Sequence, residues 1–222
     1  MSYYQRFGPV LKTRIFKRYL RWAYKKGAED LVKLNFKPGF KKEDFTCLLC
    51  GVGSEQTANE FIRFVTNRNP RAKIWIIDLG EKQVTAVKKL VKERLAKFDV
   101  NIRRVNALEL NKLLPEASLD WIETDGFLEY FDRQSLKRLL TIWHGLLNAD
   151  GFITTRDFVS SSRITITTDA FRIWLAKRWL GVSLFRHTKK ELVSLFKSSG
   201  FNFVVGPTPL PTYKRFTLVK RS

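Results

Sequence analysis

Two glycines and an aspartate stand where they could hold a nucleotide-like ligand. An apolar run at residues 47–50 ends in the turn Gly51-Val-Gly53 and continues as a helix-forming stretch. Glycine lets the backbone approach a bulky ligand, and the start of the helix offers unpaired N–H groups. The next apolar run, residues 73–78, ends on Asp78. An acid at the end of the second strand of a βαβ unit, roughly 20 or more residues past the glycine turn, can accept hydrogen bonds from both ribose hydroxyls.

Each signal also has a purely structural interpretation. Gly51 and Gly53 could form only a tight turn, and Asp78 could be only a favourable charge at a helix N-terminus. Cys47 and Cys50 have the spacing of a zinc or redox motif, but a second pair of ligands is missing and the chain has two histidines. We therefore expect buried apolar thiols and no metal.

The composition predicts a globular protein of one domain with an appendage. The chain has 222 residues, 44% of them hydrophobic, which is enough for a substantial core. Apolar runs stay well short of the roughly 20 residues of a membrane helix, and the N-terminus lacks the apolar core of a signal peptide, so we expect a cytoplasmic location. A net charge of +20 favours polyanionic partners such as RNA, DNA or an anionic membrane surface.

The N-terminal segment, residues 1–42, is predicted to be a basic helical arm or cap. Residues 1–26 contain eight lysines and arginines and no acid. A helix starting near residue 9 would carry one apolar stripe, formed by Leu11, Ile15, Tyr19 and Trp22 or Ala23. Three interpretations remain open: an arm that binds RNA, an interfacial helix that contacts an anionic membrane, or a cap that packs its stripe on the core.

Strand and helix patterns alternate along the main domain, residues 43–222. Predicted strands cover residues 47–50, 73–78, 101–105, 118–124, 152–155, 201–205 and 215–220. Predicted helices cover residues 55–67, 81–98, 134–147 and 188–200, the last with the capping-box pair Thr188 and Glu191. We expect Gly151 to form a left-handed cap after the third of these helices.

Residues 156–187 interrupt this alternation as an insert. Serines and threonines cluster at residues 160–168, and residues 171–179 mix aromatic with cationic side chains. Such a mixture can stack on bases and hold phosphates. The alternative is an amphipathic helix that covers an edge of the sheet.

The order of these motifs resembles the class I S-adenosylmethionine-dependent methyltransferases. The resemblance covers about residues 43–222 and rests on five segments: the glycine turn at 48–53, the strand end at 76–79, residues 105–107, residues 119–130 and residues 146–153. It implies an α/β, Rossmann-like fold with a seven-stranded, mostly parallel sheet, a reversed last strand and helices on both faces. It also implies S-adenosylmethionine as the cofactor.

The resemblance assigns roles to particular residues. Gly51 and Gly53 would pass beneath the methionine and ribose, Asp78 would bind the ribose hydroxyls, and Asn106 would face the adenine amino group. Leu79 and Ala107 belong to the same cofactor-binding segments. Asp125 and Gly126 would line the space between cofactor and nucleophile, with Tyr130 nearby; Asp125 and Tyr130 are the catalytic candidates.

Three positions depart from the family pattern. The family often has an acid where this chain has Leu49, and a third glycine where it has Glu55. Glu55 could supply the missing carboxylate to the cofactor or crowd its site. Asn106 replaces a more usual aspartate, and its amide oxygen can still accept a hydrogen bond from an amino group.

The predicted function is methyl transfer to an acceptor that the sequence does not identify. The charge favours RNA, whereas residues 125–130 look more like the equivalent stretch of enzymes that act on small molecules, and a lipid acceptor stays open. The alternative is a nucleic-acid-binding protein on this fold without turnover. Aminopropyl transfer is disfavoured, because a cationic polyamine substrate usually requires an acidic pocket.

Overall fold

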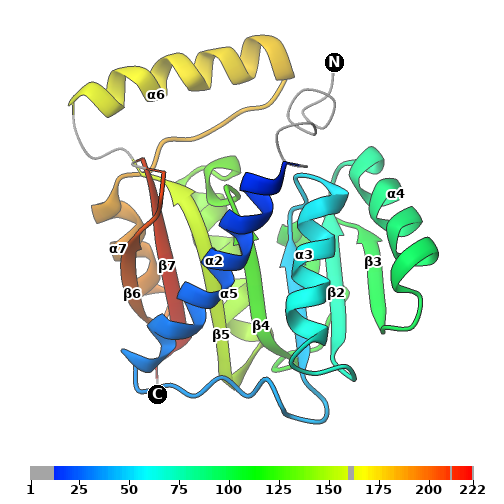
Figure 1. The fold of residues 1–222 in the computed structure, drawn as a ribbon. Coiled ribbons are helices and arrows are strands. Elements are labelled where there is room, and N and C mark those ends of the chain that lie inside the picture. Colours follow the sequence, from blue (N-terminus) through cyan, green and yellow to red (C-terminus); the bar gives the residue numbers. More distant parts are fainter. Residues whose placement is uncertain (1–12, 160–162, 211, 222) are drawn as a thin grey trace.

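The structure, a computed structural model, describes residues 13–159, 163–210 and 212–221 (Figure 1). Its centre is a sheet of seven strands in the order β3-β2-β1-β4-β5-β7-β6. The strands are β1 (Thr46–Cys50), β2 (Lys73–Asp78), β3 (Val100–Arg104), β4 (Leu119–Asp125), β5 (Leu147–Phe158), β6 (Phe201–Pro207) and β7 (Tyr213–Lys220). Neighbouring strands are parallel except at β7, which runs antiparallel to both β5 and β6. The predicted fold class, with its reversed last strand, is confirmed.

Helices cover both faces of the sheet. The helices are α2 (Arg14–Val32), α3 (Glu55–Thr66), α4 (Glu81–Leu90), α5 (Arg133–Leu146), α6 (Arg163–Leu175) and α7 (Lys189–Ser198). One buried cluster contains apolar side chains of α5 and α7, and the other contains those of α2, α3 and α4. Because both faces are covered, the central strand β1 is almost entirely apolar, and its residues 47–50 are buried. None of the helices in the described ranges has the length and apolar character needed to cross a membrane.

Short helical turns complete the connections between strands and helices. They are η1 (Val91–Leu95), η2 (Ala107–Lys112), η3 (Leu128–Tyr130) and η4 (Ala176–Leu180). The first continues α4 and the last continues α6, in each case as a wider π-helical turn. The turns η2 and η3 follow β3 and β4, so they lie at the carboxyl edge of the sheet.

Helix α2 packs on the core through a face that matches the predicted stripe at Tyr19 and Ala23 but not at Ile15. Its buried positions include Leu20, Ala23, Tyr24 and Leu31, whereas Ile15 is exposed. The predicted stripe is therefore wrong at Ile15, and Leu11 lies outside the described residues. The helix begins at the N-cap Thr13, whose side chain accepts a hydrogen bond from the backbone of Phe16. The helix contacts α3 and β7, as the cap interpretation expects.

Gly151 does not form the predicted left-handed cap. The chain leaves α5 at Leu146 and enters β5 directly at Leu147, so Gly151 lies inside a strand. A Cβ atom there would come within 2.9 Å of the backbone oxygen of Leu119, which explains why a glycine is needed. The glycine permits close packing of two strands where their register shifts.

Two other local predictions agree with the structure. Thr188 and Glu191 form the predicted capping box at the start of α7. Both cysteines are buried and free. Part of the insert forms α6, which lies crosswise above the ends of the strands in Figure 1; residues 160–162 of the serine and threonine cluster lie outside the described residues.

Candidate functional site

A cavity of about 580 Å³ opens at the carboxyl ends of β1, β2 and β4. The strand order reverses between β1 and β4, and ligands of open α/β sheets bind at such a switch point. Its walls include the residues predicted to bind cofactor at Gly51, Gly53, Asp78, Leu79, Asn106, Ala107, Asp125 and Gly126, and also Tyr130. The volume falls in the usual range of about 300–1,000 Å³ for small-molecule sites.

The glycine turn forms the floor of this cavity. Gly51 has a φ of +75°, which favours glycine. A Cβ atom at this position would lie 2.6 Å from the Phe127 ring, so a larger residue would displace that ring. Ser54 then caps α3 by accepting a hydrogen bond from the backbone of Thr57. The turn is thus held at both ends with its backbone open to the cavity.

The Asp78 carboxylate is fixed by the backbone around it. One oxygen accepts from the Val52 amide and the other from the Gly80 amide, each at 2.6 Å. Burial raises the pKa of Asp78 above its usual value, although these amides oppose the shift. Each carboxylate oxygen retains further acceptor capacity, so two ribose hydroxyls can still be bound. The free acceptor positions of this carboxylate therefore fit the two ribose hydroxyls of an adenosine-containing ligand.

The loop after β3, which was predicted to face the adenine, uses part of the Asn106 side chain for its own structure. Its amide oxygen accepts from the Leu108 backbone at 3.0 Å and so caps η2. That oxygen keeps one lone pair, and the NH₂ group keeps its donors. Ala107 is buried in the wall, and the exposed Leu79 lies at the rim. Both side chains give this part of the cavity lining an apolar character.

The catalytic candidate Asp125 lines the cavity, but its charge is already engaged. Its carboxylate lies 3.1 Å from the Arg156 guanidinium and accepts a hydrogen bond from the Tyr19 hydroxyl at 3.4 Å. Burial raises the pKa of Asp125, and Arg156 opposes the shift. A carboxylate that neutralises a buried arginine positions the cavity wall, and it is a poor candidate for a free general base.

Arg156 joins this aspartate to a second buried acid that the sequence reasoning missed. The guanidinium also pairs with Glu123 of β4, and Thr154 donates a hydrogen bond to that glutamate. Burial raises the pKa of Glu123 to about 7, although Arg156 opposes the shift. The sequence predicts the fifth strand over residues 152–155, whereas β5 continues to Phe158. Arg156 is accommodated inside the sheet because Glu123 and Asp125 of β4 face it.

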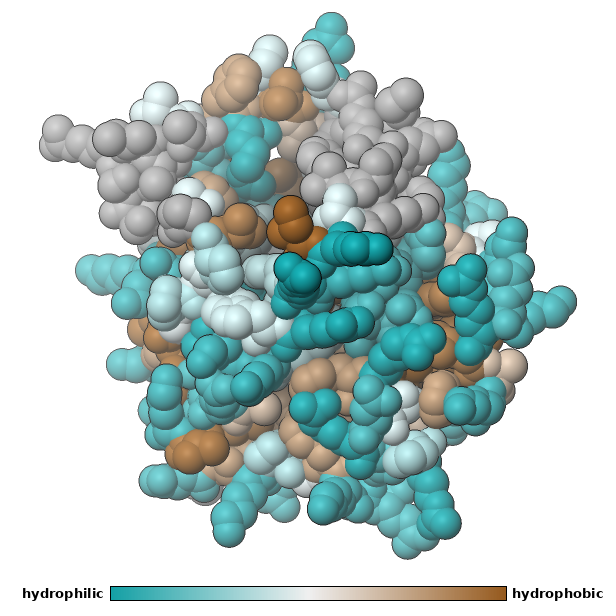
Figure 2. All heavy atoms as spheres, in the orientation of Figure 1, coloured by the Kyte–Doolittle hydropathy of each residue, from teal (hydrophilic) through white to brown (hydrophobic). Residues whose placement is uncertain are grey.

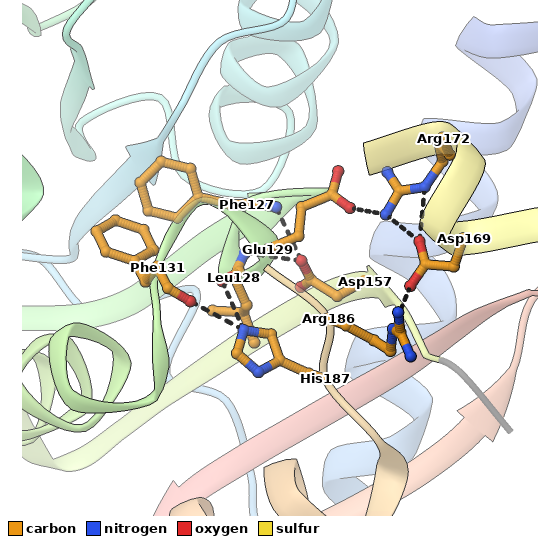
Figure 3. A network of polar contacts seen from close by, with 9 residues as sticks. All are labelled: Phe127, Leu128, Glu129, Phe131, Asp157, Asp169, Arg172, Arg186 and His187. Atoms are coloured by element: carbon orange, nitrogen blue, oxygen red, sulfur yellow. Dashed lines mark hydrogen bonds and ion pairs between the residues drawn. The ribbon is translucent and has the colours of Figure 1, made fainter. Parts of the chain in front are cut away.

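A second polar network holds the η3 turn against the cavity (Figure 3). The buried Asp157 carboxylate accepts from the backbone amides of Phe127 at 2.8 Å and Leu128 at 2.7 Å. Nε2 of His187 faces two carbonyl oxygens, those of Leu128 and Phe131, so it must carry a proton. This network fixes the aromatic part of the cavity wall.

Arg172 connects the insert to the same turn. Its guanidinium lies 2.6 Å from the Glu129 carboxylate and 2.8 Å from Asp169, as Figure 3 shows. Farther along, the Phe185 amide donates to the backbone oxygen of Glu129 at 2.7 Å. Helix α6 and the segment after it are therefore tied to the loop that follows β4.

The segment after η4 supplies a wall that the sequence did not predict. The residues that it contributes are Gly181, Val182, Ser183 and Phe185. The mixed aromatic and cationic composition of the insert was the only sequence signal there, and it did not indicate which side chains face a cavity. Together with Phe127 and Phe131, this segment makes one side of the cavity apolar.

One predicted cofactor residue is not part of the wall. Glu55 begins α3, directly after the N-cap Ser54, and it is absent from the cavity lining. The expected contact between its carboxylate and the cofactor has no support in this geometry. Within the described ranges, no group of histidine, cysteine or carboxylate side chains could hold a metal ion.

No protein-family model matches the sequence, and no curated protein matches it significantly. Solved structures are similar to it at low sequence identity. Mitomycin 7-O-methyltransferase MmcR superposes with a TM-score of 0.63 and 16% identity, over 100% of this chain and 61% of that one. The YcgJ protein of Bacillus subtilis superposes with a TM-score of 0.63 and 14% identity, over 82% of this chain and 94% of that one. LepI in complex with S-adenosylmethionine superposes with a TM-score of 0.59 and 12% identity, over 81% of this chain and 44% of that one.

These likenesses establish the fold. The chain has the fold of the class I S-adenosylmethionine-dependent methyltransferases, with the cavity at the sheet's switch point. It spans less than two thirds of the length of MmcR and less than half that of LepI.

Proposed function

We propose that the protein is an S-adenosylmethionine-dependent methyltransferase whose acceptor is an apolar small molecule or a lipid. The observation that carries the proposal is the pairing of the Gly51 turn with the Asp78 carboxylate at one cavity. The open backbone would pass beneath the methionine and ribose, and Asp78 would accept from the ribose hydroxyls. Asn106 would bind the adenine edge, between the apolar side chains of Leu79 and Ala107.

The other side of the cavity supports an apolar acceptor. Phe127, Phe131, Val182 and Phe185 line it, with Tyr130 as a polar group at the same wall. Aromatic and aliphatic walls bind apolar surface and exclude water. None of the three similar structures above is named for an RNA substrate.

The chain's own residues would act mainly by alignment. When bound, S-adenosylmethionine supplies a methyl group that its sulfonium already activates. An in-line displacement then requires the acceptor atom to be held in line with the methyl group. Phe127, fixed by Asp157, and Phe185, fixed by the Glu129 carbonyl, would hold the acceptor. Tyr130 and the Asp125 carboxylate would line the transfer position, with Asp125 acting through the wall that it shapes.

Methyl transfer can be tested without knowing the acceptor. Purified protein is incubated with S-adenosylmethionine carrying a labelled methyl group and with separate fractions of lipids, small metabolites and RNA from cells. We expect label in the lipid or the small-metabolite fraction. With the methyl donor below saturation, Asp78→Ala should reduce this label several-fold, and the matched control Asp99→Ala, an exposed aspartate just before β3, should retain it.

Two results would contradict the proposal. Label that enters RNA alone would overturn the apolar acceptor and restore the interpretation based on net charge. Failure to bind S-adenosylhomocysteine at near-millimolar concentration, together with absence of label in every fraction, would overturn the activity itself.

A further inference from the structure

The outer face of α6 and η4 is unusually rich in exposed aromatic side chains. Phe171 is 63% exposed, Trp174 is 56% exposed and Trp179 is 56% exposed. The rings of Phe171 and Trp174 stack on each other with centroids 5.8 Å apart. Large aromatic side chains are normally buried in a soluble domain, so their concentration on one segment indicates an interaction surface.

The helical spacing separates this outer face from an inner one. Asp169 and Ala176 are buried and Arg172 is bound to Glu129, and these positions face the rest of the protein. Phe171, Trp174 and Arg178 are spaced three and four residues apart, so they share the opposite face. Phe171 and Trp174 therefore belong to the side of the helix that the core does not use, whereas Trp179 is exposed at the end of η4.

Cations accompany the aromatic side chains on this face. Lys177 and Arg178 are exposed, and Asp169, the one acidic residue of α6 and η4, is buried. The first turns of α2 reach the same carboxyl edge of the sheet, since Tyr19 contacts Asp125 there. They add the exposed Arg14 and Arg18 and an Ile15 that is 79% exposed. We call the exposed aromatic and cationic residues of α6, η4 and the start of α2 the outer patch.

The shape of the outer patch favours a flat partner. In Figure 1, α6 is the outermost element above the strand ends. Hydrophilic residues cover most of the face that α2 and α3 present, and the hydrophobic residues visible on it include some at the level of α6 and the start of α2 (Figure 2). A single strand of RNA is usually held in a groove with its bases on open rings. Here the helix is convex, and the Phe171 and Trp174 rings cover each other.

We propose that the outer patch docks the protein on an anionic lipid bilayer. Tryptophan and phenylalanine would enter the headgroup layer, where such rings are favoured, and Lys177, Arg178, Arg14 and Arg18 would meet anionic headgroups. The helix α6 would lie in the interface plane. Since residues 181–185 follow η4 directly and line the cavity, docking would place the apolar side of the cavity next to the membrane.

Vesicle co-sedimentation of the full chain tests this proposal. We expect binding to vesicles of phosphatidylcholine mixed with phosphatidylglycerol, and little binding to phosphatidylcholine alone. The double variant Phe171→Ser/Trp174→Ser should weaken the binding by about tenfold or more, because it removes the apolar part of the patch. Lys177→Gln/Arg178→Gln should weaken it by a similar factor and reduce its dependence on salt.

Matched controls lie at the opposite, amino edge of the sheet. Lys37→Gln/Lys41→Gln removes two exposed lysines from the loop before β1, and Val32→Ser removes a side chain that is 70% exposed at the end of α2. Both should bind vesicles as the unaltered protein does. Circular dichroism of every variant checks that each is folded.

Three outcomes would overturn the proposal. The first is vesicle binding by the aromatic double variant that equals that of the unaltered protein. The second is a loss of binding in the Lys37/Lys41 control as large as that in the Lys177/Arg178 variant, which would indicate a diffuse charge effect. The third is salt-dependent RNA binding, or self-association, that the aromatic variant abolishes while vesicles are not bound. The proposal does not depend on the cofactor, so its failure would leave the methyl-transfer assay unaffected.

Discussion

Asp78 is the residue on which the proposed cofactor site depends most. Its carboxylate closes the glycine turn through the Val52 amide and faces the cavity. Loss of the ribose hydrogen bonds in Asp78→Ala should cost about 1–3 kcal/mol, which is between about fivefold and hundredfold in affinity for S-adenosylhomocysteine. Isothermal titration calorimetry measures this, with Asp99→Ala as the control. Because alanine also frees two backbone amides, Asp78→Asn separates the loss of charge from a change in the turn. Unchanged affinity in both variants would contradict the assignment.

A buried aspartate should make stability depend on pH. Burial raises the pKa of Asp157 from 3.8 to about 7, with the hydroxyl of Thr155 opposing and the charge of Glu129 adding to the shift. Between about pH 4 and pH 7 the folded protein then holds a proton that the unfolded chain has released. Stability from this group should fall as pH rises through that window, by up to about 1.4 kcal/mol per pH unit.

Asp157→Asn is the variant that tests this dependence. The amide oxygen of asparagine can still accept from the Phe127 and Leu128 amides, and it does not titrate. Urea unfolding between pH 4 and pH 8 should show a flatter profile in this variant than in the unaltered protein. The exposed Asp150→Asn should leave the profile as it is. A variant profile as steep as the original would show that Asp157 is ionised throughout.

At the residue scale, sequence patterns identified site residues that have a local signature and missed the ion pairs that form between neighbouring strands. The glycine turn and Asp78 were found because a bend and a strand-terminal acid have their own signatures. The sequence patterns end the fifth strand at Thr155 and place Arg156 in the insert, whereas it lies inside β5. Its acidic partners lie about 30 residues earlier on β4, and only the sheet register brings them opposite.

Among the elements, α2 joins the N-terminal segment to the last strand through a buried ion pair. Asp30 of α2 accepts from Arg215 of β7 at 2.6 Å, and both side chains are almost fully buried. Removing the cation in Arg215→Ala leaves a buried carboxylate with only Lys33 beside it, and should cost about 3–5 kcal/mol of unfolding free energy. Chemical denaturation measures the loss. The exposed pair of Lys26 and Glu29 gives the control, since Lys26→Ala should cost about 1 kcal/mol or less. If Arg215→Ala and Lys26→Ala lost the same unfolding free energy, the ion pair at Asp30 would not be what anchors α2.

Helix α2 also shows why the buried face of a helix is harder to predict than the position of the helix in the sequence. The sequence placed a helix in the first 30 residues, and its predicted stripe matches the buried side at Tyr19 and Ala23 but not at Ile15. Aromatic and aliphatic residues recur on more than one face of α2, so periodicity alone could not choose between them. Contacts with α3 and β7 decide the choice, and the exposed stripe is left at the outer patch.

For the whole molecule, ligand binding should appear as added stability. A ligand that binds only the folded state at about one hundred times its Kd adds about 2.7 kcal/mol to the free energy of unfolding. For a chain of this size, that is a rise in Tm of roughly 5–10 °C. S-adenosylhomocysteine should produce this rise in differential scanning calorimetry, and adenine alone should produce a smaller one. An equal rise in Asp78→Ala would place the ligand elsewhere.

For the whole molecule, net charge predicts which ligands the surface attracts, whereas the order of strand patterns predicts the fold. The net charge of +20 suggested RNA from composition, but it states only that the surface attracts anions. The fold was predictable because seven strand patterns occur in the order of a known topology. The cavity wall from residues 181–185 was not predictable, because it depends on how the insert returns to the turn after β4.

The most direct test of the central claim is a crystal structure of the protein with S-adenosylhomocysteine. We predict density for the ligand in the cavity between β1 and β4, with both ribose hydroxyls at about 2.6–3.2 Å from the Asp78 carboxylate and the adenine beside Asn106. Clear density for the ligand at any other place, or a cavity without it at saturating concentration, would contradict the claim.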